Sequence, residues 1–280
     1  MIRDFRQADI EQIDHLIKHI DTGYEIDNSI YIQANALKIL VHEQDTIKGL
    51  AYAIVSTNDA NEKEMQIRMY VEPQSRNKGI GTALYNELER NLNGFGADIL
   101  TAYIKTECSY PSSFCHKMGF EKWWGSPELL YTGDIFPDVN LKMKIYEDTY
   151  FEQYVKVVQE SYFELHKAND LKPYIVTKDI VLKYKLNNIK NVFIAIENDQ
   201  IVASVTIGKG TIDNLMVSPD FQGKGYGKQA VQFGVSELLI QGYDDIHICY
   251  MEGNTSAENL YTSIGFKHLH TTHVFRKFAR

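Results

Sequence analysis

Hydrophobic positions in the first half of the chain follow helical and strand spacing in turn. Ile10, Ile13 and Leu16 recur every three residues and so mark one face of a helix. Runs rich in β-branched residues are bounded by polar clusters such as residues 58–64, which is typical of strands joined by turns. The pattern predicts strands at 2–6, 39–42, 47–56, 65–71, 99–104 and 120–124, and helices at 8–20, 29–40, 80–92 and 112–118.

The second half repeats this order of elements. A turn cluster at residues 197–200 joins two runs of apolar residues and predicts a hairpin. The pattern predicts strands at 141–145, 192–196, 201–207, 212–217 and 246–250, one or two strands in 266–278, and helices at 150–166, 178–186, 226–241 and 256–264.

Three short motifs recur with one offset of 146 positions. Arg76–Gly81 returns as Gln222–Gly227, Gly119-Phe120 as Gly265-Phe266, and Val71-x-Pro73 as Val217-x-Pro219, so the chain carries one unit twice. The first copy has about eight additional residues, which we assign to the loop at 58–64 because surface loops tolerate insertions. The turn-rich segment 133–137 marks the boundary and predicts domains at 1–138 and 139–280.

Composition is that of a globular protein, with 44% apolar and 24% charged residues. No apolar stretch approaches the roughly 20 residues that span a bilayer, and the N-terminal residues lack the apolar core of a secretion signal. Three cysteines without metal-ligand spacing fit a reducing compartment. We therefore expect a cytoplasmic protein with no membrane partner.

The net charge of −8 lies in the first half, where residues 1–140 carry 13 basic and 21 acidic side chains. Residues 141–280 carry 16 of each. Nucleic-acid backbones require a basic face, so we expect no nucleic-acid partner.

The segment Gln222–Gly227 follows a strand and opens a helix. Glycines at 223, 225 and 227 let the backbone turn sharply and approach a ligand closely. The first N–H groups of a helix attract an anion, and Lys224 and Lys228 add positive charge, so the loop suits a pyrophosphate. It lacks the ending of a Walker loop, and it follows a late strand rather than the first strand of a Rossmann unit.

Three histidines, His268, His270 and His273, lie in the last predicted strand. Alternation along a strand explains their spacing better than metal binding does, because no carboxylate or cysteine nearby in the sequence completes a ligand set. We expect no metal.

The second copy resembles the GNAT superfamily of acyl-CoA-dependent N-acyltransferases. The resemblance rests on Gln222–Gly227 with the segment Asn254-x-x-Ala257, Leu260-Tyr261 and Gly265-Phe266, and the order of elements agrees over both halves. It implies two tandem α/β (α+β) domains, each a mixed, mostly antiparallel twisted sheet flanked by helices. In architecture alone, this arrangement is similar to that of mycothiol synthase and other tandem members.

The resemblance implies a site for acetyl-CoA between the fourth and fifth strands of the second domain. The pyrophosphate would meet backbone N–H groups of the loop, the pantetheine arm would run beside the preceding strand, and two asparagines would bond to the cofactor. The implied cofactor-binding residues are Leu215, Met216, Val217, Gln222, Gly223, Lys224, Gly225, Tyr226, Gly227, Lys228, Asn254 and Asn259. Acceptor pockets in this family are built near positions that correspond to 20–40 and 165–190.

Two catalytic roles follow from the same resemblance. Tyr261 matches the tyrosine that protonates the leaving thiolate. Removal of the proton from the acceptor amine is assigned to Asp213, with Glu252 as the other candidate.

The first copy keeps the loop but not the downstream segment. Its implied cofactor-binding residues are Val71, Arg76, Asn77, Lys78, Gly79, Ile80 and Gly81. The repeat offset places Cys108 at Asn254 and Cys115 at Tyr261, and we interpret Cys115 as a buried apolar cysteine rather than a catalytic one. We therefore expect a catalytically degenerate first domain.

The sequence thus predicts an acetyl-CoA-dependent N-acetyltransferase that acts on an amine of a small molecule or peptide by direct transfer, with the chemistry in the second domain. Two alternatives remain. The chain is a non-catalytic acyl-CoA-binding or sensing protein, or both domains are catalytic with different acceptors.

Overall fold

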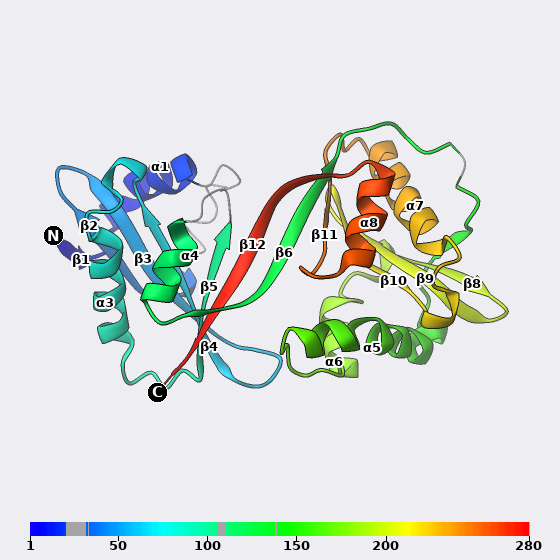
Figure 1. The fold of residues 1–280 in the computed structure, drawn as a ribbon, viewed down its shortest axis with the longest axis horizontal. Coiled ribbons are helices and arrows are strands. Elements are labelled where there is room, and N and C mark those ends of the chain that lie inside the picture. The colour runs from blue at the N-terminus through cyan, green and yellow to red at the C-terminus, as the bar shows by residue number, and fades with distance from the viewer. Residues whose placement is uncertain (21–31, 33, 106–109, 138, 280) are drawn as a thin grey trace. The chain divides into compact units, whose positions relative to one another are not determined.

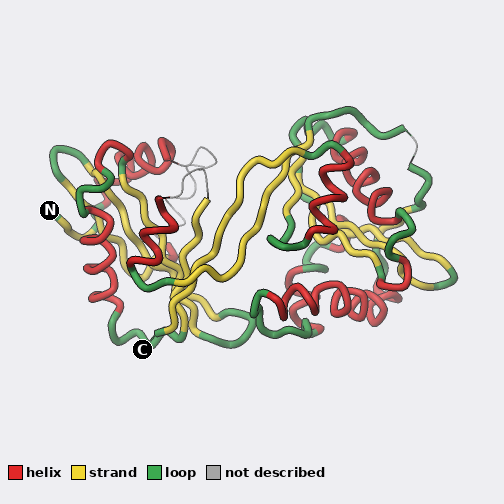
Figure 2. Tube along the Cα trace, viewed as in Figure 1, coloured by secondary structure: helices red, strands yellow, loops and turns green. Residues whose placement is uncertain are grey.

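The computed structural model describes residues 1–20, 32, 34–105, 110–137 and 139–279 (Figure 1). The chain forms two compact units. The first unit holds most of residues 1–122 together with the residues from Val274 onward, and the second holds Trp123–His273. In both units strands are flanked by helices (Figure 2), and the sheets are mostly antiparallel, as predicted.

The first unit is built on the strand order β1-β2-β3-β4-β5-β12. The pairs from β1 to β4 are antiparallel, and β4 and β5 run parallel. The elements of the first repeat are β1 (Ile2–Asp4), η1 (Gln7–Asp9), α1 (Ile10–Ile20), β2 (Ala36–Glu43), β3 (Ile47–Thr57), β4 (Lys63–Val71), η2 (Pro73–Ser75), α3 (Ile80–Leu92), β5 (Ile99–Lys105), α4 (Tyr110–Lys117) and β6 (Glu121–Tyr131).

Apolar side chains cover both faces of this sheet. Ile13, Leu16 and Ile17 of α1 pack against one group of strand residues, and Leu84 and Leu88 of α3 pack against another. All five side chains are buried, which explains the helical spacing seen in the sequence.

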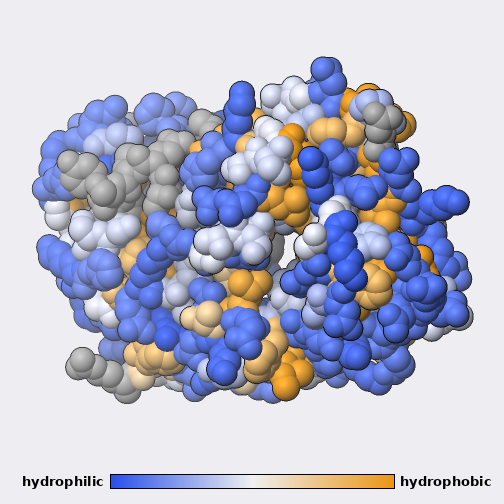
Figure 3. Space-filling view, turned by 45° about the vertical axis from the view of Figure 1, so that its right-hand side comes forward, coloured by the Kyte–Doolittle hydropathy of each residue, from blue (hydrophilic) through white to orange (hydrophobic). Residues whose placement is uncertain are grey.

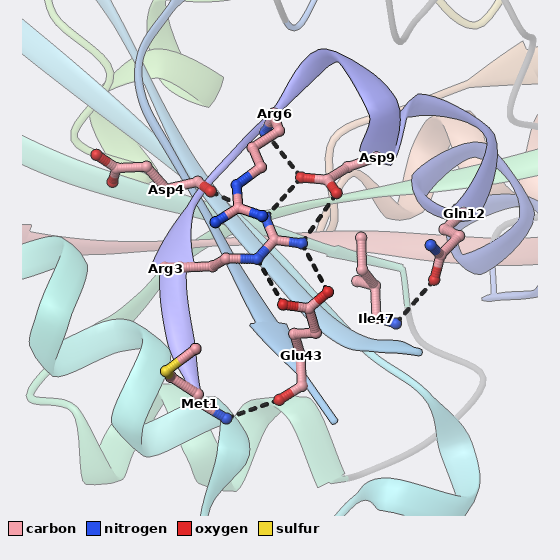
Figure 4. Close-up of polar contacts among 8 residues, drawn as sticks. All are labelled: Met1, Arg3, Asp4, Arg6, Asp9, Gln12, Glu43 and Ile47. Carbon is pink, nitrogen blue, oxygen red and sulfur yellow. Dashed lines mark hydrogen bonds and ion pairs between the residues drawn. The ribbon is translucent and has the colours of Figure 1, made fainter. Parts of the chain in front are cut away.

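A polar network fixes the start of the chain against β2 (Figure 4). The Arg3 guanidinium donates to Asp9 Oδ2 at 2.7 Å and to Glu43 Oε2 at 2.6 Å. Hydrogen bonds from Arg3 hold the pKa of Asp9 below its ordinary value. Because the folded-state pKa is lowered, the stabilisation is present above the unfolded pKa of about 4 and is lost as the pH falls through the folded value.

The second unit has the strand order β12-β6-β11-β10-β9-β8-β7, and its one parallel pair among described residues is β10 with β11. Its other elements are β7 (Met143–Ile145), η3 (Asp148–Tyr150), α5 (Phe151–Ala168), α6 (Lys178–Tyr184), η4 (Ile189–Asn191), β8 (Val192–Glu197), β9 (Gln200–Ile207), β10 (Thr211–Val217), η5 (Pro219–Phe221), α7 (Tyr226–Ile240), β11 (Ile246–Cys249), α8 (Thr255–Ile264) and β12 (Lys267–Phe278).

Helices cover the two faces of this second sheet in pairs. Figure 1 shows α5 and α6 on one side of β8–β10, and α7 and α8 on the other. The first pair encloses a core that contains Tyr154 and Met216, and the second encloses a core that contains Ile212 and Tyr261.

The last strand of each repeat lies outside the repeat's own unit. β6 ends the first repeat, yet its residues from Trp123 onward belong to the second unit, where β6 pairs antiparallel with β11. β12 ends the second repeat, yet its residues from Val274 onward belong to the first unit, where Phe275 joins the core beneath α3. The division into domains at 1–138 and 139–280 stays a prediction about the two sequence repeats. The compact units differ from the repeats because each unit contains part of the final strand of the other repeat.

One predicted element is wrong in part. Of the helix expected at 29–40, positions 29–31 and 33 lie outside the described residues and residues 32, 34 and 35 are helical, but positions 36–40 form the start of β2. Leu40 pairs with Ala51 of β3 and is buried there, so strand pairing and burial outweigh the local preference for helix. The other predicted elements are found with shifted ends, and the segment 120–124 is the start of the longer β6.

The face drawn in Figure 3 is largely hydrophilic with scattered apolar side chains. Within the described residues, no helix is both long and apolar enough to cross a membrane.

The exchanged end of β12 generates a prediction about stability. Phe275 is 1% exposed in the core of the first unit, whereas Phe278 on the same strand is 53% exposed. We expect Phe275→Ala to lower the free energy of unfolding by about 3–5 kcal/mol, and Phe278→Ala to lower it by less than about 0.5 kcal/mol. Urea unfolding of both variants measures the difference, and equal losses would show that β12 does not complete this core.

Candidate active site

Strand β10 carries one extra residue in its pairing with β9. Asp213 pairs with Thr206 and Met216 with Ser204, so three steps along β10 match two along β9. Asn214, inside this bulge, has a left-handed φ of 49°. The bulge also switches the face to which residues point, because Ile212 packs in the core beneath α7 and α8 whereas Met216 packs in the core beneath α5 and α6.

Strands β10 and β11 are paired only at their first residues. Thr211 pairs with His247 and Ile212 with Ile248, after which the parallel ladder stops at the bulge. Leu215, Met216 and Val217 therefore continue beside a strand to which they are not paired. Unpaired backbone groups here are available to a ligand.

The loop after β10 needs its glycines for two different reasons. Gly223 has a φ of 74° and Gly225 a φ of 87°, and a Cβ built on either would meet nothing within 4 Å. Gly227 instead lies against its neighbours, because a Cβ there would meet Val217 Cγ2 at 3.3 Å and Leu260 Cδ2 at 3.4 Å. The first two permit the turn, and the third lets α7 approach β10 closely.

The first turn of α7 has no side-chain cap. Its N-cap is Gly225, so the N–H groups of Tyr226, Gly227 and Lys228 start the helix without a side-chain acceptor. Gln222 Nε2 donates to the carbonyl of Val217 at 3.2 Å and ties the loop to the end of β10, while Lys224 Nζ donates to the Asp220 carbonyl at 2.8 Å. The loop thus combines an open glycine turn with an uncapped, positive helix end, which fits a pyrophosphate.

Tyr261 lies on α8 and is 5% exposed. Burial raises the pKa of its phenol well above the ordinary value, so the hydroxyl keeps its proton at neutral pH. The nearby phenol of Tyr162 and thiol of Cys249 raise it further. A protonated phenol suits the predicted role of general acid.

The two predicted asparagines occupy different positions on α8. Asn254 is the N-cap, and its Oδ1 accepts from the Ala257 N–H at 3.1 Å. Asn259 is exposed on the helix. Their contacts with a cofactor stay predictions.

Two residues that carry no motif contact the bulge from the helices α5 and α6. The hydroxyl of Tyr162 on α5 lies 3.5 Å from Asn214 Oδ1. Lys185, which directly follows α6, donates to the same oxygen. The Lys185 ammonium also lies 4.2 Å from the centre of the Tyr162 ring. Burial lowers the pKa of Lys185 to about 8, although the nearby Asp213 carboxylate opposes this shift. Lys185 falls in the predicted acceptor segment 165–190, whereas the segment 20–40 lies mostly outside the described residues.

A row of polar side chains crosses the same face of the sheet. Thr211 donates to Asp213 Oδ2 at 3.1 Å and pairs in register with His247 on β11. His247 Nδ1 lies 2.7 Å from Glu128 Oε1 on β6, and His270 Nε2 on β12 lies 3.2 Å from the other oxygen of that carboxylate. Sequence reasoning missed Glu128 because β6 belongs to the other repeat.

The histidines of β12 lie apart from any metal-binding arrangement. His270 faces Glu128, and His273 lies 3.6 Å from Glu252, the other candidate base. Across the described part of the chain, no three His, Cys, Asp or Glu side chains are grouped to hold a metal ion.

The first repeat keeps the loop without the bulge. Asn77 has a φ of 61° and Gly79 a φ of 82°, and Arg76 Nε donates to the Val71 carbonyl at 3.1 Å, as Gln222 does to Val217. The helix α3 likewise begins at a glycine without a side-chain cap. However, β4 pairs with β3 in unbroken register from Lys63 to Val71.

Side chains at the centre of the first repeat also differ. Ile67 pairs with Ala102 as Ile212 pairs with Ile248, so Arg68 stands at the position of Asp213 before the bulge. Its guanidinium lies 4.5 Å from the ring of Tyr103, which stands at the position of Cys249. Cys115, at the position of Tyr261, is buried as predicted, and burial raises the pKa of its thiol to about 12. Cys108, at the position of Asn254, lies outside the described residues.

The second repeat thus combines a bulged strand that separates from its parallel neighbour with a glycine loop that opens an uncapped helix. The family model described as "Acetyltransferase (GNAT) domain" matches residues 35–122 and again 188–268. The chain therefore belongs to the GNAT acetyltransferase family, as a tandem member.

Solved structures share this tandem fold at low identity. A GCN5-related N-acetyltransferase from Sphaerobacter thermophilus is 17% identical, with a TM-score of 0.74 over 99% of this chain and 95% of that one. A tandem GNAT protein from the clavulanic acid biosynthesis pathway is 14% identical, with a TM-score of 0.65 over 100% of this chain and 98% of that one.

One curated relative matches a shorter region. The [ribosomal protein bS18]-alanine N-acetyltransferase of Haemophilus ducreyi is 31% identical over 77 residues. The match spans 26% of this chain and about half of that relative, 53% of its length.

The thiol environments predict an order of chemical reactivity. Cys115 is buried whereas Cys249 is exposed, and the pKa values of the two thiols are raised to about 12 and about 11, so both are mostly protonated at pH 8. We expect iodoacetamide to label Cys249 slowly and Cys115 more slowly still, measured residue by residue by peptide mass spectrometry. The urea-unfolded chain is the control, and a native Cys115 that reacts at the unfolded rate would contradict its burial.

Proposed function

We propose that the second repeat binds acetyl-CoA and transfers its acetyl group to an amine of a small molecule or peptide. The observation that carries this proposal is the bulge in β10, which ends the pairing with β11 directly before the loop and the uncapped helix α7. The backbone N–H groups of Gln222–Lys228 would hold the pyrophosphate, and residues Leu215–Val217 would hold the pantetheine arm. Bound acetyl-CoA supplies the activated acetyl group.

Two side chains handle the protons in this proposal. Asp213, exposed at the bulge, accepts a proton from the acceptor ammonium, so that the neutral amine nitrogen can bond to the acetyl carbon. As the carbon–sulfur bond breaks, Tyr261 donates its proton to the leaving sulfur, and the second proton that the attacking nitrogen loses restores the Tyr261 phenol. The amide and the thiol are then the products, and no acyl-enzyme is needed.

The relative from Haemophilus ducreyi is named for acetylating an alanine of a ribosomal protein. That name supports a peptide amine as one acceptor class. A cytoplasmic location belongs to the same proposal, because such acceptors and acetyl-CoA are found there.

We further propose that the first repeat has lost catalysis. Its loop retains the backbone geometry for pyrophosphate, but an unbroken β4, Arg68 at the base position and a buried Cys115 at the acid position remove the proposed chemistry. The alternative of two catalytic domains would require groups that the described residues of this repeat do not place there.

Two equivalent glycines test which repeat carries the reaction. Gly79 and Gly225 have φ values of 82° and 87°, which a valine adopts only with strain. We expect Gly225→Val to lower acetyl-CoA affinity at one site by roughly 10- to 100-fold and to abolish transfer, while Gly79→Val leaves most of the transfer activity. Calorimetric titration counts the sites, and a panel of amino acids and alanyl peptides measures transfer.

The opposite result, with transfer lost in Gly79→Val and kept in Gly225→Val, would place catalysis in the first repeat. Binding without transfer to any amine would instead favour the alternative of a sensing protein.

Cys115 stands in the first repeat at the position of Tyr261, so a variant at Cys115 is the matched control for a variant at Tyr261. We expect Tyr261→Phe to lower kcat by about 100-fold or more with the Kd for acetyl-CoA nearly unchanged, because the ring remains and only the proton donor is removed. Cys115→Ala is expected to leave kcat within about twofold. Steady-state rates of CoA release measure both, and unchanged turnover in Tyr261→Phe would exclude the acid role.

A further inference from the structure

Lys185 is a partly buried cation in the second repeat that the proposed acetyl transfer does not use. It directly follows α6, and its ammonium points to the bulge of β10, where it donates to Asn214 Oδ1. Across the described residues it forms no ion pair, and the other hydrogens of the ammonium are left for another acceptor. A lysine removed from water without a paired anion is costly, so an anionic partner would be bound strongly.

Tyr162 provides a second donor at the same place. Its ring lies 4.2 Å below the Lys185 ammonium, and its hydroxyl contacts Asn214 Oδ1 at the long distance of 3.5 Å. A hydrogen bond of that length is weak, so the O–H can turn to a better acceptor. The two donors therefore meet at one point beside the bulge.

The location is on the acceptor side of the sheet. α5 and α6 cover the face to which Asp213 points, whereas the loop Gln222–Gly227 opens α7 on the opposite face (Figure 1). The charged and titratable groups that face Lys185 are Asp213 from β10 and the Tyr162 phenol from α5. A carboxylate and an ammonium thus stand side by side, which matches an acceptor that carries both an amino group and an acidic group.

We propose that Lys185 and Tyr162 bind a carboxylate of the acceptor. The chain would then acetylate amines that carry a carboxylate near the amino group. This inference rests on the proposed function of the second repeat. The acceptor ammonium faces Asp213, and its carboxylate accepts from Lys185 Nζ and Tyr162 Oη. One ammonium and one phenol match the two oxygens of a carboxylate. A phosphate dianion would need more donors than these two, and its second charge would meet stronger repulsion from Asp213 than a carboxylate does.

The proposal predicts that binding is linked to proton uptake. Burial lowers the pKa of Lys185 to about 8, so at pH 8.5 much of the free protein holds a neutral amine. A bound carboxylate stabilises the charged form and raises this pKa, so the protein takes up protons from the buffer when the anion binds.

Binding of product-like probes tests the inference without requiring turnover. The probes are N-acetylalanine, N-acetylleucine and N-acetylglutamate, which are chosen because none has a titratable amine. Each is compared with its α-carboxamide, which lacks the α-carboxylate. They are titrated into the full chain saturated with CoA, at pH 8.5, in two buffers of different ionisation enthalpy. For at least one pair we expect the acid to bind about tenfold or more tightly than the amide, with net proton uptake for the acid only.

Four variants separate recognition from structure. Lys185→Met should remove both the preference and the proton uptake, and Tyr162→Phe should reduce the preference with uptake kept. Lys185→Arg should keep the preference without uptake, because arginine stays charged. Lys178→Met is the matched control, since this lysine of α6 contacts Glu152 at 2.6 Å on the surface and should bind as the unaltered chain does.

The inference is overturned if the acid and the amide bind equally, which includes no measurable binding of either. It is also overturned if Lys185→Met keeps the preference for the acid while its circular dichroism and melting temperature match those of the unaltered chain. Failure of the proposed transfer is a separate result, because it appears as the absence of amine acetylation in the panel described above rather than in these titrations.

Discussion

The additional residue in β10 is the feature on which the site in the second repeat depends. It ends the ladder with β11, and it turns Met216 toward the core of α5 and α6 although Ile212 faces α7 and α8. The unpaired part of the strand and the loop that follows are thereby opened to a ligand on one side, while Asp213 and Asn214 face the helices α5 and α6 on the other. One backbone irregularity thus brings the two proposed binding surfaces together.

The two repeats show what the same loop does with and without that irregularity. Both loops use positive φ angles at equivalent positions, and both tie the residue before the turn to the last carbonyl of the strand. In the first repeat the strand stays regular, and an arginine–tyrosine contact occupies the equivalent centre. The loop is therefore a feature of the fold, and the proposed chemistry belongs to the strand before it and to Tyr261 on α8.

Sequence periodicity and motifs predicted most elements, the family and the position of the loop, because these depend on local spacing and on backbone conformations that favour glycine. Helix positions 36–40 were wrong because the preference of that segment for β2 comes from pairing with β3, which no local pattern reveals. Tyr162, Lys185 and Glu128 could not be predicted as site residues. Each reaches the site through tertiary contacts from α5, from the segment after α6, or from a strand of the other repeat.

The exchange of final strands has a consequence for the order in which the protein is made. The first unit holds almost all of its residues within the first 122, and these leave the ribosome early. Its core nevertheless includes Phe275, which is translated only at the end of the second repeat. The unit that is synthesised first is therefore completed last, and until then the side of β5 that β12 covers is an open strand edge that the nascent chain must keep from other partners.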